Sequence, residues 1–234
     1  MKKYILILSL FIFVFTSCDE GRLYQDRLIV PEEGRVVKLH ANMGGVDTWP
    51  DGYTVVLAGF NDDKDYSLIA KSIPNNGDVN LVMAGIGENV TSIELCVTNR
   101  IRERVYSFYT QDFSAADTDT IRVDAGTIDA GMFNVIQQGV FLGKSCVGCH
   151  GTSTTAAANL DLKKGVSYDD LVNRPSVIKP EWMRVAPGNA DESMLYQILS
   201  SSISKEWGHD HSQEIESPLT LEMLKDWIDS GAKE

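Results

Sequence analysis

Two thiols and an imidazole lie together in the run Cys146-Val147-Gly148-Cys149-His150. Thiols at this spacing can form thioether bonds with the two vinyl groups on one edge of a porphyrin, and the adjacent imidazole can then ligate the iron. Gly148 is expected to let the chain turn closely against that edge. The run therefore predicts one covalent haem c, with Cys146 and Cys149 as attachment sites and His150 as an iron ligand.

The same thiols leave two other kinds of site open. The run His209-Asp210-His211 supplies two more imidazoles, so a Cys2His2 zinc site is the second interpretation. A redox-active pair formed by Cys146 and Cys149 is the third, although the βαβ pattern of thioredoxin-like proteins is missing. Cys96 lies in an apolar, strand-like run and is expected to be a buried, unreactive thiol.

The first residues have the layout of a bacterial export signal. Two lysines precede an apolar run from Tyr4 to Phe15, which is short for a membrane-spanning helix. The run Thr16-Ser17-Cys18 follows and resembles a lipobox, so a signal peptide over residues 1–17 and lipidation of Cys18 are expected. The lipid anchor would hold the protein at the cell envelope, on the periplasmic face or the outer membrane.

Charge and composition exclude several classes of protein. The chain has 21 Lys and Arg against 33 Asp and Glu, which gives a formal net charge of −12. This charge opposes the neutralisation of phosphates on which nucleic-acid binding depends, so we expect no nucleic-acid partner. With 43% hydrophobic residues and no apolar run of about 18 residues or more, the sequence is that of a globular protein and not of a multi-span membrane protein.

Residues 18–125 are expected to form an Ig-like all-β sandwich. Short β-rich runs alternate there with turn residues about every ten positions. His40 stands alone in this part and is expected to be a structural or surface residue. The expected strands are Val36–His40, Tyr53–Phe60, Tyr66–Ile73, Asp78–Ala84, Thr91–Thr98 and Val105–Thr110.

Near residue 126 the hydrophobic period changes to that of helices. A first stripe is expected to end near Gly143, before the cysteine motif, and consists of Met132, Phe133, Ile136, Val140 and Phe141. A second stripe, widened by Trp227, consists of Leu221, Leu224 and Ile228. Ser217-Pro218 is a start signal for that helix, and Ser167 is expected to cap a shorter helix through Val172.

The C-terminal part of the chain resembles the planctomycete-type cytochrome c domain over about residues 129–234. The resemblance rests on an ordered series of short motifs: Cys146-Val147-Gly148-Cys149-His150-Gly151, Asn159-Leu160-Asp161-Leu162, Arg184-Val185-Ala186-Pro187-Gly188-Asn189, Ser193-Met194-Leu195 and Trp227-Ile228-Asp229-Ser230-Gly231-Ala232. It implies a small all-α cytochrome c domain over residues 126–234, in which the first and last helices pack beside the haem. The expected fold class is therefore α+β multidomain, an Ig-like sandwich followed by this domain.

The chain departs from that family at the second iron ligand. Members usually supply a methionine from the loop before the last helix, but here residues 204–212 contain no methionine and two histidines. We expect His211 to be this ligand, with His209 and then Met183 as alternatives, and an open position after them. Two imidazoles would give a lower potential than an imidazole and a thioether.

These features predict a lipid-anchored monohaem c-type cytochrome that transfers one electron between redox partner proteins at the cell envelope. On this interpretation the protein is an electron carrier and not an enzyme. The alternatives are a haem-based enzyme or sensor with an open distal position, peroxidase-like or gas-binding, and an interaction lipoprotein stapled by Cys2His2 zinc.

Overall fold

The computed structural model describes residues 34–62, 65–113, 120–151 and 156–234. The chain from Glu33 to Glu234 forms one compact unit. The expected signal peptide and Cys18 lie outside the described residues. Within the described ranges, no helix has both the length and the apolar composition needed to cross a membrane.

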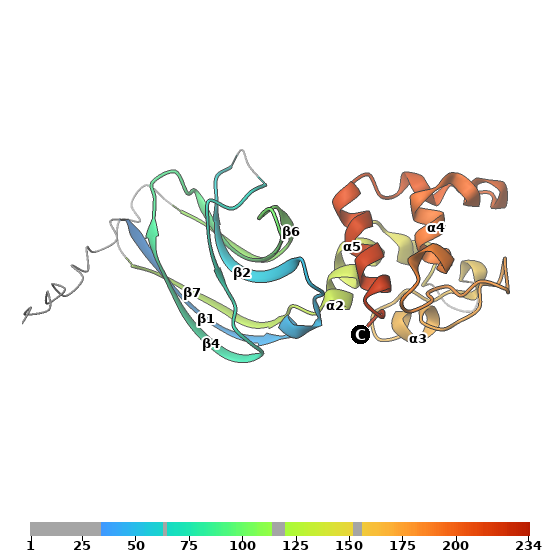
Figure 1. The fold of residues 1–234 in the computed structure, drawn as a ribbon, viewed down its shortest axis with the longest axis horizontal. Coiled ribbons are helices and arrows are strands. Elements are labelled where there is room, and N and C mark those ends of the chain that lie inside the picture. The colour runs from blue at the N-terminus through green and yellow to red at the C-terminus, as the bar shows by residue number, and fades with distance from the viewer. Residues whose placement is uncertain (1–33, 63–64, 114–119, 152–155) are drawn as a thin grey trace, which may run out of the picture. The chain divides into compact units, whose positions relative to one another are not determined.

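Seven strands occur in the described residues and form two sheets (Figure 1). One sheet has the order β4-β1-β7 and the other the order β3-β2-β5-β6. Neighbouring strands are antiparallel except β1 and β7, which run parallel with Val37 opposite Ile121. The strands are β1 (Arg35–Gly44), β2 (Tyr53–Phe60), β3 (Ile69–Ser72), β4 (Gly77–Ile86), β5 (Ser92–Asn99), β6 (Arg104–Asp112) and β7 (Thr120–Asp129).

Side-chain burial follows from the alternation along each strand. In β1 buried and exposed residues alternate from Val37 to Met43, so one face of this sheet is turned to the core and the other to solvent. In β5 every residue from Ser92 to Thr98 is buried. Cys96 belongs to this strand and is fully buried in a small apolar cluster with Phe60, as expected from the apolar run around it.

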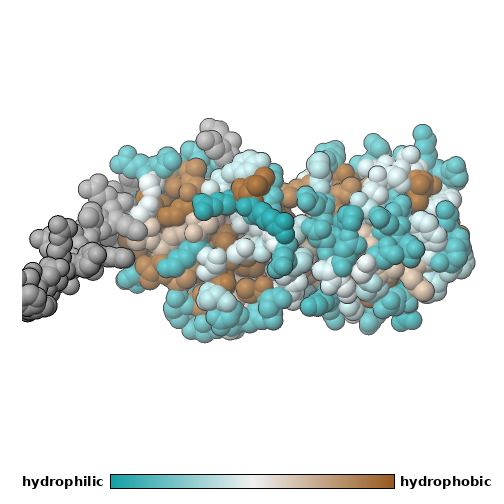
Figure 2. Space-filling view, in the orientation of Figure 1, coloured by the Kyte–Doolittle hydropathy of each residue, from teal (hydrophilic) through white to brown (hydrophobic). Residues whose placement is uncertain are grey.

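The described residues after Asp129 form short helices and single turns. The α-helices are α2 (Met132–Ile136), α3 (Ser167–Leu171), α4 (Met194–Ser200) and α5 (Pro218–Asp229), and α2 continues into a π-helix, η3 (Gln137–Leu142). The 3-10 turns of this part are η4 (Cys146–Gly148), η6 (Ala157–Asn159), η7 (Ala190–Glu192), η8 (Ser202–Trp207) and η9 (His211–Gln213), and one more, η2 (Val46–Thr48), lies between β1 and β2. On the face shown in Figure 2, hydrophilic residues cover most of this helical segment.

The helical segment buries its apolar side chains in one core. Phe133 of α2 stacks on Trp227 of α5 with ring centroids 5.3 Å apart, and the expected stripe from Met132 to Phe141 is buried against them. The Ser217 hydroxyl caps α5 by accepting a hydrogen bond from the Thr220 amide.

The predicted cap at Ser167 is wrong. This residue is fully buried, and its hydroxyl bonds to the side chain of Gln137 instead of capping α3.

Some side chains within this unit contact both the core of the strands and the core of the helices. Trp49, Val105 and Phe108 pack against both the core of the strands and the core of the helices. The Trp49 indole N–H donates to the Ala130 carbonyl at 2.7 Å, where the last strand leads into α2. The strand-rich part and the helical segment are therefore joined by packing as well as by the chain.

The expected fold class is wrong. The chain is mostly β in its regular structure, with seven strands in two sheets, and the helices that follow are few and short. It does not contain a small all-α cytochrome c domain, and a separate N-terminal β domain is not shown. The physical reason lies between Gly143 and Gly188, where glycines and prolines interrupt the apolar pattern, so that turns and isolated bridges such as Val172–Val185 replace longer helices.

Candidate functional site

The cysteine motif lies in a tight turn directly after η3. The chain leaves η3 through Ser145, whose φ of 61° is left-handed, and then forms η4. The Cys146 carbonyl accepts hydrogen bonds from the amides of Cys149 (3.2 Å) and His150 (2.9 Å), which closes the turn. These main-chain bonds fix the two thiols and the imidazole on one compact piece of backbone.

The glycine that this turn requires is Gly151 and not Gly148. A Cβ atom added to Gly148 would meet nothing within 4 Å, whereas one added to Gly151 would lie 2.9 Å from the carbonyl oxygen of Val147. The expected role of Gly148 in a close turn is thus not required by the protein's own packing. Gly151 is buried and allows the segment after His150 to lie against the turn.

The two thiols have different surroundings. Cys146 is half-buried, with its Sγ 3.6 Å from the Val140 carbonyl oxygen, and burial raises the pKa of its thiol. Cys149 is exposed. Both are free thiols in this structure, so one sulfur is seated against η3 and the other is open to solvent.

His150 is oriented by the loop that follows it. Its Nδ1 lies 2.9 Å from the Ala157 carbonyl oxygen. A carbonyl can only accept, so Nδ1 carries the proton and Nε2 keeps its lone pair. The ring is half-buried, and this burial is the main reason that the pKa of the imidazole is below its ordinary value. In this state Nε2 is the ring nitrogen of His150 that has a lone pair available for a ligand.

Arg184 braces the loop that orients His150. Its guanidinium donates to the carbonyl oxygens of Ala158 (2.9 Å) and Asn159 (3.0 Å), which directly follow Ala157. It also donates to the Asp170 carbonyl oxygen at 2.8 Å. Because Ala158 and Asn159 both have left-handed φ values, this strained loop depends on such external bonds.

His211 faces His150 although the two are far apart in the sequence. Their ring centroids are 6.1 Å apart and their planes are inclined by 35°. The Nδ1 of His211 lies 3.0 Å from the Oγ of Ser204, and burial lowers the pKa of the imidazole. Among the residues that the structure describes, the Nε2 atoms of His150 and His211 make no hydrogen bond.

The two alternative ligands are placed differently. His209 packs edge-on against His211 with centroids 4.6 Å apart, but its Nε2 lies 3.0 Å from Glu214 Oε1 and is already engaged. Met183 is 40% exposed and lies in a backbone bridge to Pro175 and Ser193. His211 differs from both, because its ring lies 6.1 Å from that of His150 and its Nε2 makes no hydrogen bond among the described residues.

The four residues of the proposed zinc set do not form a compact cluster. In the described ranges, no three side chains of His, Cys, Asp or Glu converge closely enough to hold a metal ion. The arrangement that the structure does present is a pair of facing imidazoles next to two free thiols.

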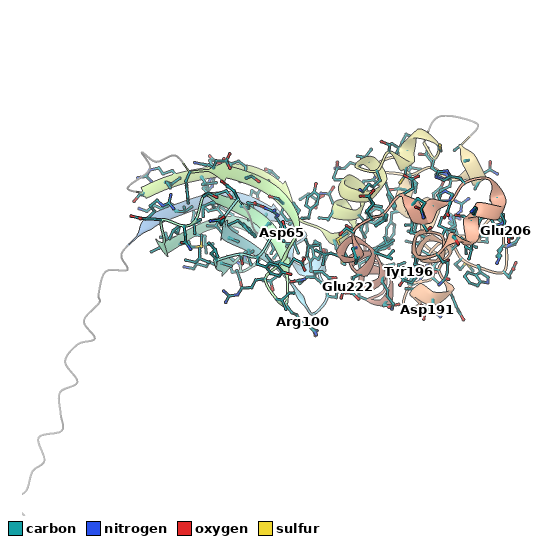
Figure 3. The ribbon with its side chains drawn as sticks, turned by 90° about the horizontal axis from the view of Figure 1, so that it is seen from above. Asp65, Arg100, Asp191, Tyr196, Glu206 and Glu222 are labelled. Atoms are coloured by element: carbon teal, nitrogen blue, oxygen red, sulfur yellow. The ribbon has the colours of Figure 1, made fainter. Side chains whose placement is uncertain are left out.

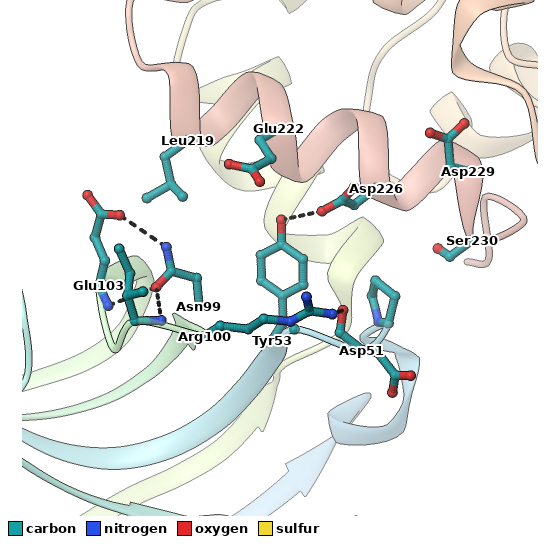
Figure 4. A pocket seen from close by; sticks show the side chains of 13 residues that line it. Asp51, Tyr53, Asn99, Arg100, Glu103, Leu219, Glu222, Asp226, Asp229 and Ser230 are labelled. Atoms are coloured by element: carbon teal, nitrogen blue, oxygen red, sulfur yellow. Dashed lines mark hydrogen bonds between the residues drawn. The ribbon is translucent and has the colours of Figure 1, made fainter.

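A cavity lies between the ends of β2 and β5 and the helix α5, away from this pair (Figure 4). It has a volume of about 620 Å³ and is lined by polar residues that include Tyr53, Arg100 and Glu222. Figure 3 shows Arg100 and Glu222 near each other, and Glu206 of η8 well apart from them in the helical segment. Neither His150 nor His211 lines the cavity, so the cavity and the imidazole pair are separate features.

The sequence indicates the cysteines and histidines as candidates but not the groups that orient the two imidazoles. Ser204, Arg184 and the carbonyl of Ala157 act only through contacts that the fold creates. For Arg184 a signal existed, because it belongs to one of the short motifs quoted above, whereas Ser204 carried none.

No family model, no curated protein and no solved structure matches the chain.

Proposed function

We propose that the protein is a monohaem c-type cytochrome that carries single electrons at the cell envelope. The observation that carries the proposal is the facing pair His150 and His211 beside Cys146 and Cys149. A metal–imidazole bond is about 2 Å long and a ring centre lies about 1 Å behind its nitrogen, so two imidazoles on opposite sides of one iron have centroids about 6 Å apart. The separation of 6.1 Å between the His150 and His211 centroids is compatible with this arrangement.

The donor set of the site also suits haem. A bound haem supplies one-electron chemistry at its iron. Cys146 and Cys149 would hold it through thioethers, while His150 and His211 would each offer Nε2 and keep Nδ1 bonded to the protein. With one imidazole from His150 and one from His211, these residues would favour electron transfer by the haem over the binding of oxygen, peroxide or gases.

The two imidazoles also affect the reduction potential of the haem. Neutral nitrogen ligands stabilise oxidised iron more than a thioether does, so the potential is expected to be lower than with a methionine ligand. Burial lowers the pKa of both imidazoles, which favours the neutral form that can ligate a metal.

Charge and the N-terminal sequence suggest how the carrier is used. Residues 126–234 contain 9 Lys and Arg against 15 Asp and Glu, a net charge of 9 − 15 = −6. Such a surface steers basic redox partners and repels acidic ones, mainly through the association rate. Lipidation of Cys18 would keep these encounters at the membrane.

The test is to produce the full chain in a host that attaches haem to exported proteins. Haem that survives acid–acetone extraction, together with a low-spin spectrum of the reduced protein that carbon monoxide does not alter, supports the proposal. Loss of all colour on extraction refutes covalent attachment, and bound zinc in the same sample would then indicate the zinc-stapled alternative. Retained colour with rapid carbon monoxide binding refutes the six-coordinate carrier and indicates an open-site enzyme or sensor.

A further inference from the structure

Ser204 is a buried hydroxyl that contacts His211 twice. It lies in η8 and is 0% exposed. Its Oγ is 3.0 Å from the main-chain nitrogen of His211 and 3.0 Å from the Nδ1 of the same residue. One side chain therefore holds both the backbone and the ring of the proposed second ligand.

The direction of the hydrogen bond between Ser204 Oγ and His211 Nδ1 decides which ring nitrogen keeps its lone pair. A backbone N–H can only donate, so the hydroxyl oxygen accepts there, and its second lone pair can accept from Nδ1–H. In that state the proton of His211 is on Nδ1 and the lone pair is on Nε2. A hydroxyl that donated to Nδ1 instead would leave the proton on Nε2, where it would block a metal.

The neighbouring His209 has the opposite arrangement. Its Nε2, the nitrogen that His211 keeps free, is the atom bonded to Glu214 at 3.0 Å. The two histidines stand two positions apart on one loop, yet their partners engage different nitrogens. The two rings therefore differ in which nitrogen is hydrogen-bonded, and His211 is the one whose Nε2 stays free to ligate iron.

We propose that Ser204 is a positioning residue that selects His211 over His209 as the second iron ligand. It does so by accepting the Nδ1 proton and by fixing the ring toward His150. The inference rests on the proposed function, because it concerns the same haem site. A neutral acceptor of this kind also leaves His211 a neutral imidazole, whereas a carboxylate acceptor would draw the Nδ1 proton away and strengthen the bond to oxidised iron.

The test compares Ser204→Ala with Ser202→Ala in the haem-loaded full chain. Ser202 is an exposed residue of the same turn, so it is a matched control. Loss of an outer hydrogen-bond partner weakens metal ligation about 10- to 100-fold. Ser204→Ala should therefore raise the fraction of haem that binds carbon monoxide by about ten-fold or more, and Ser202→Ala should leave it unchanged. Equal behaviour of the two variants would overturn the inference.

A double variant separates positioning from plain structural support. If Ser204 acts through His211, then adding Ser204→Ala to His211→Ala should change neither the spin state nor carbon monoxide binding further. A further change of similar size in the His211→Ala background would show that Ser204 acts on the haem by another route. Thermal unfolding of each protein reports the structural cost separately.

A measurement on the unaltered protein covers the case in which Ser204→Ala does not fold. In the reduced, diamagnetic state, nitrogen NMR should show His211 with a slowly exchanging Nδ1–H and iron on Nε2. A His211 without this proton, or iron on His209, would contradict the inference. Failure of the chain to bind haem covalently refutes the proposed function, whereas covalent haem with unaffected variants refutes only the role of Ser204.

Discussion

The hydrogen bond between Tyr53 and Asp226 joins the strand-rich part to the last helix. The hydroxyl of Tyr53, at the start of β2, donates to Asp226 Oδ2 of α5 at 2.8 Å (Figure 4). Both residues are half-buried, and burial together with this bond raises the pKa of the phenol well above its ordinary value. Changing Tyr53 to Phe removes this bond and keeps the ring, which packs at 5.4 Å from Trp49.

The expected loss follows from the partners. A hydrogen bond to a charged group contributes about 1.5–3 kcal/mol when fully buried, and water that reaches Asp226 reduces this to about 1–1.5 kcal/mol. For a chain of this size, such a loss lowers the midpoint of thermal unfolding by about 3 °C. Tyr66→Phe is the control, because Tyr66 is 46% exposed and no hydrogen bond of its hydroxyl occurs among the described residues.

The assay is thermal unfolding followed by circular dichroism and by tryptophan fluorescence. Since Trp49, Val105 and Phe108 belong to both cores, the two signals should fall together in one transition. A Tyr53→Phe variant as stable as the Tyr66→Phe variant would refute the estimate. Two separate transitions in the unaltered protein would refute the coupling between strands and helices.

Three further predictions concern the ligands, the anchor and the sheet surface. His211→Ala should convert the haem-loaded protein largely to a high-spin form that binds carbon monoxide, whereas His209→Ala should stay low-spin. Similar spectra for both variants would contradict the assignment of the ligand. The mature protein should begin at a lipidated Cys18, and a mass that shows an unmodified cysteine there would exclude the anchor. Hydrogen bonds that the His40 ring donates to Asp78 and Asp124 raise the pKa of His40, so the imidazolium stabilises the fold below pH 6.5 and this effect is lost as the pH rises through the folded-state pKa. His40→Gln should therefore lower the unfolding midpoint at pH 5.5 and leave it unchanged at pH 9; equal shifts at both pH values would refute this account.

Local elements were predictable where the pattern was strong. The expected runs Tyr53–Phe60 and Val105–Thr110 coincide with β2 and with the centre of β6, and the helical stripe from Met132 to Phe141 spans α2 and η3. The strand β7 (Thr120–Asp129) was not among the expected strands. Its residues alternate only weakly in polarity, and its extended form depends on pairing with β1, which is distant in the sequence.

The all-α domain implied by the resemblance to a cytochrome family was wrong. Short motifs specify local chemistry, whereas the packing of helices depends on the residues between them. Cys146, Cys149 and His150 were found because their spacing is itself the signal. The Ser204 hydroxyl and the Ala157 carbonyl were not, since each acts on a histidine through the tertiary fold. The orientation of a ligand is thus less visible in a sequence than its identity.

The parallel pair of β1 and β7 has a consequence for the order in which the chain folds. The strand β1 lies between β4 and β7. Its hydrogen bonds to β7 therefore cannot form until Thr120–Asp129 has been synthesised. Pairings between such distant segments form slowly, and until then β1 presents an open edge that can capture another chain. During synthesis from the N-terminus, the segment Cys146–His150 follows only after this edge can close. Machinery that acts on the two cysteines would then meet a chain whose sheets are already complete.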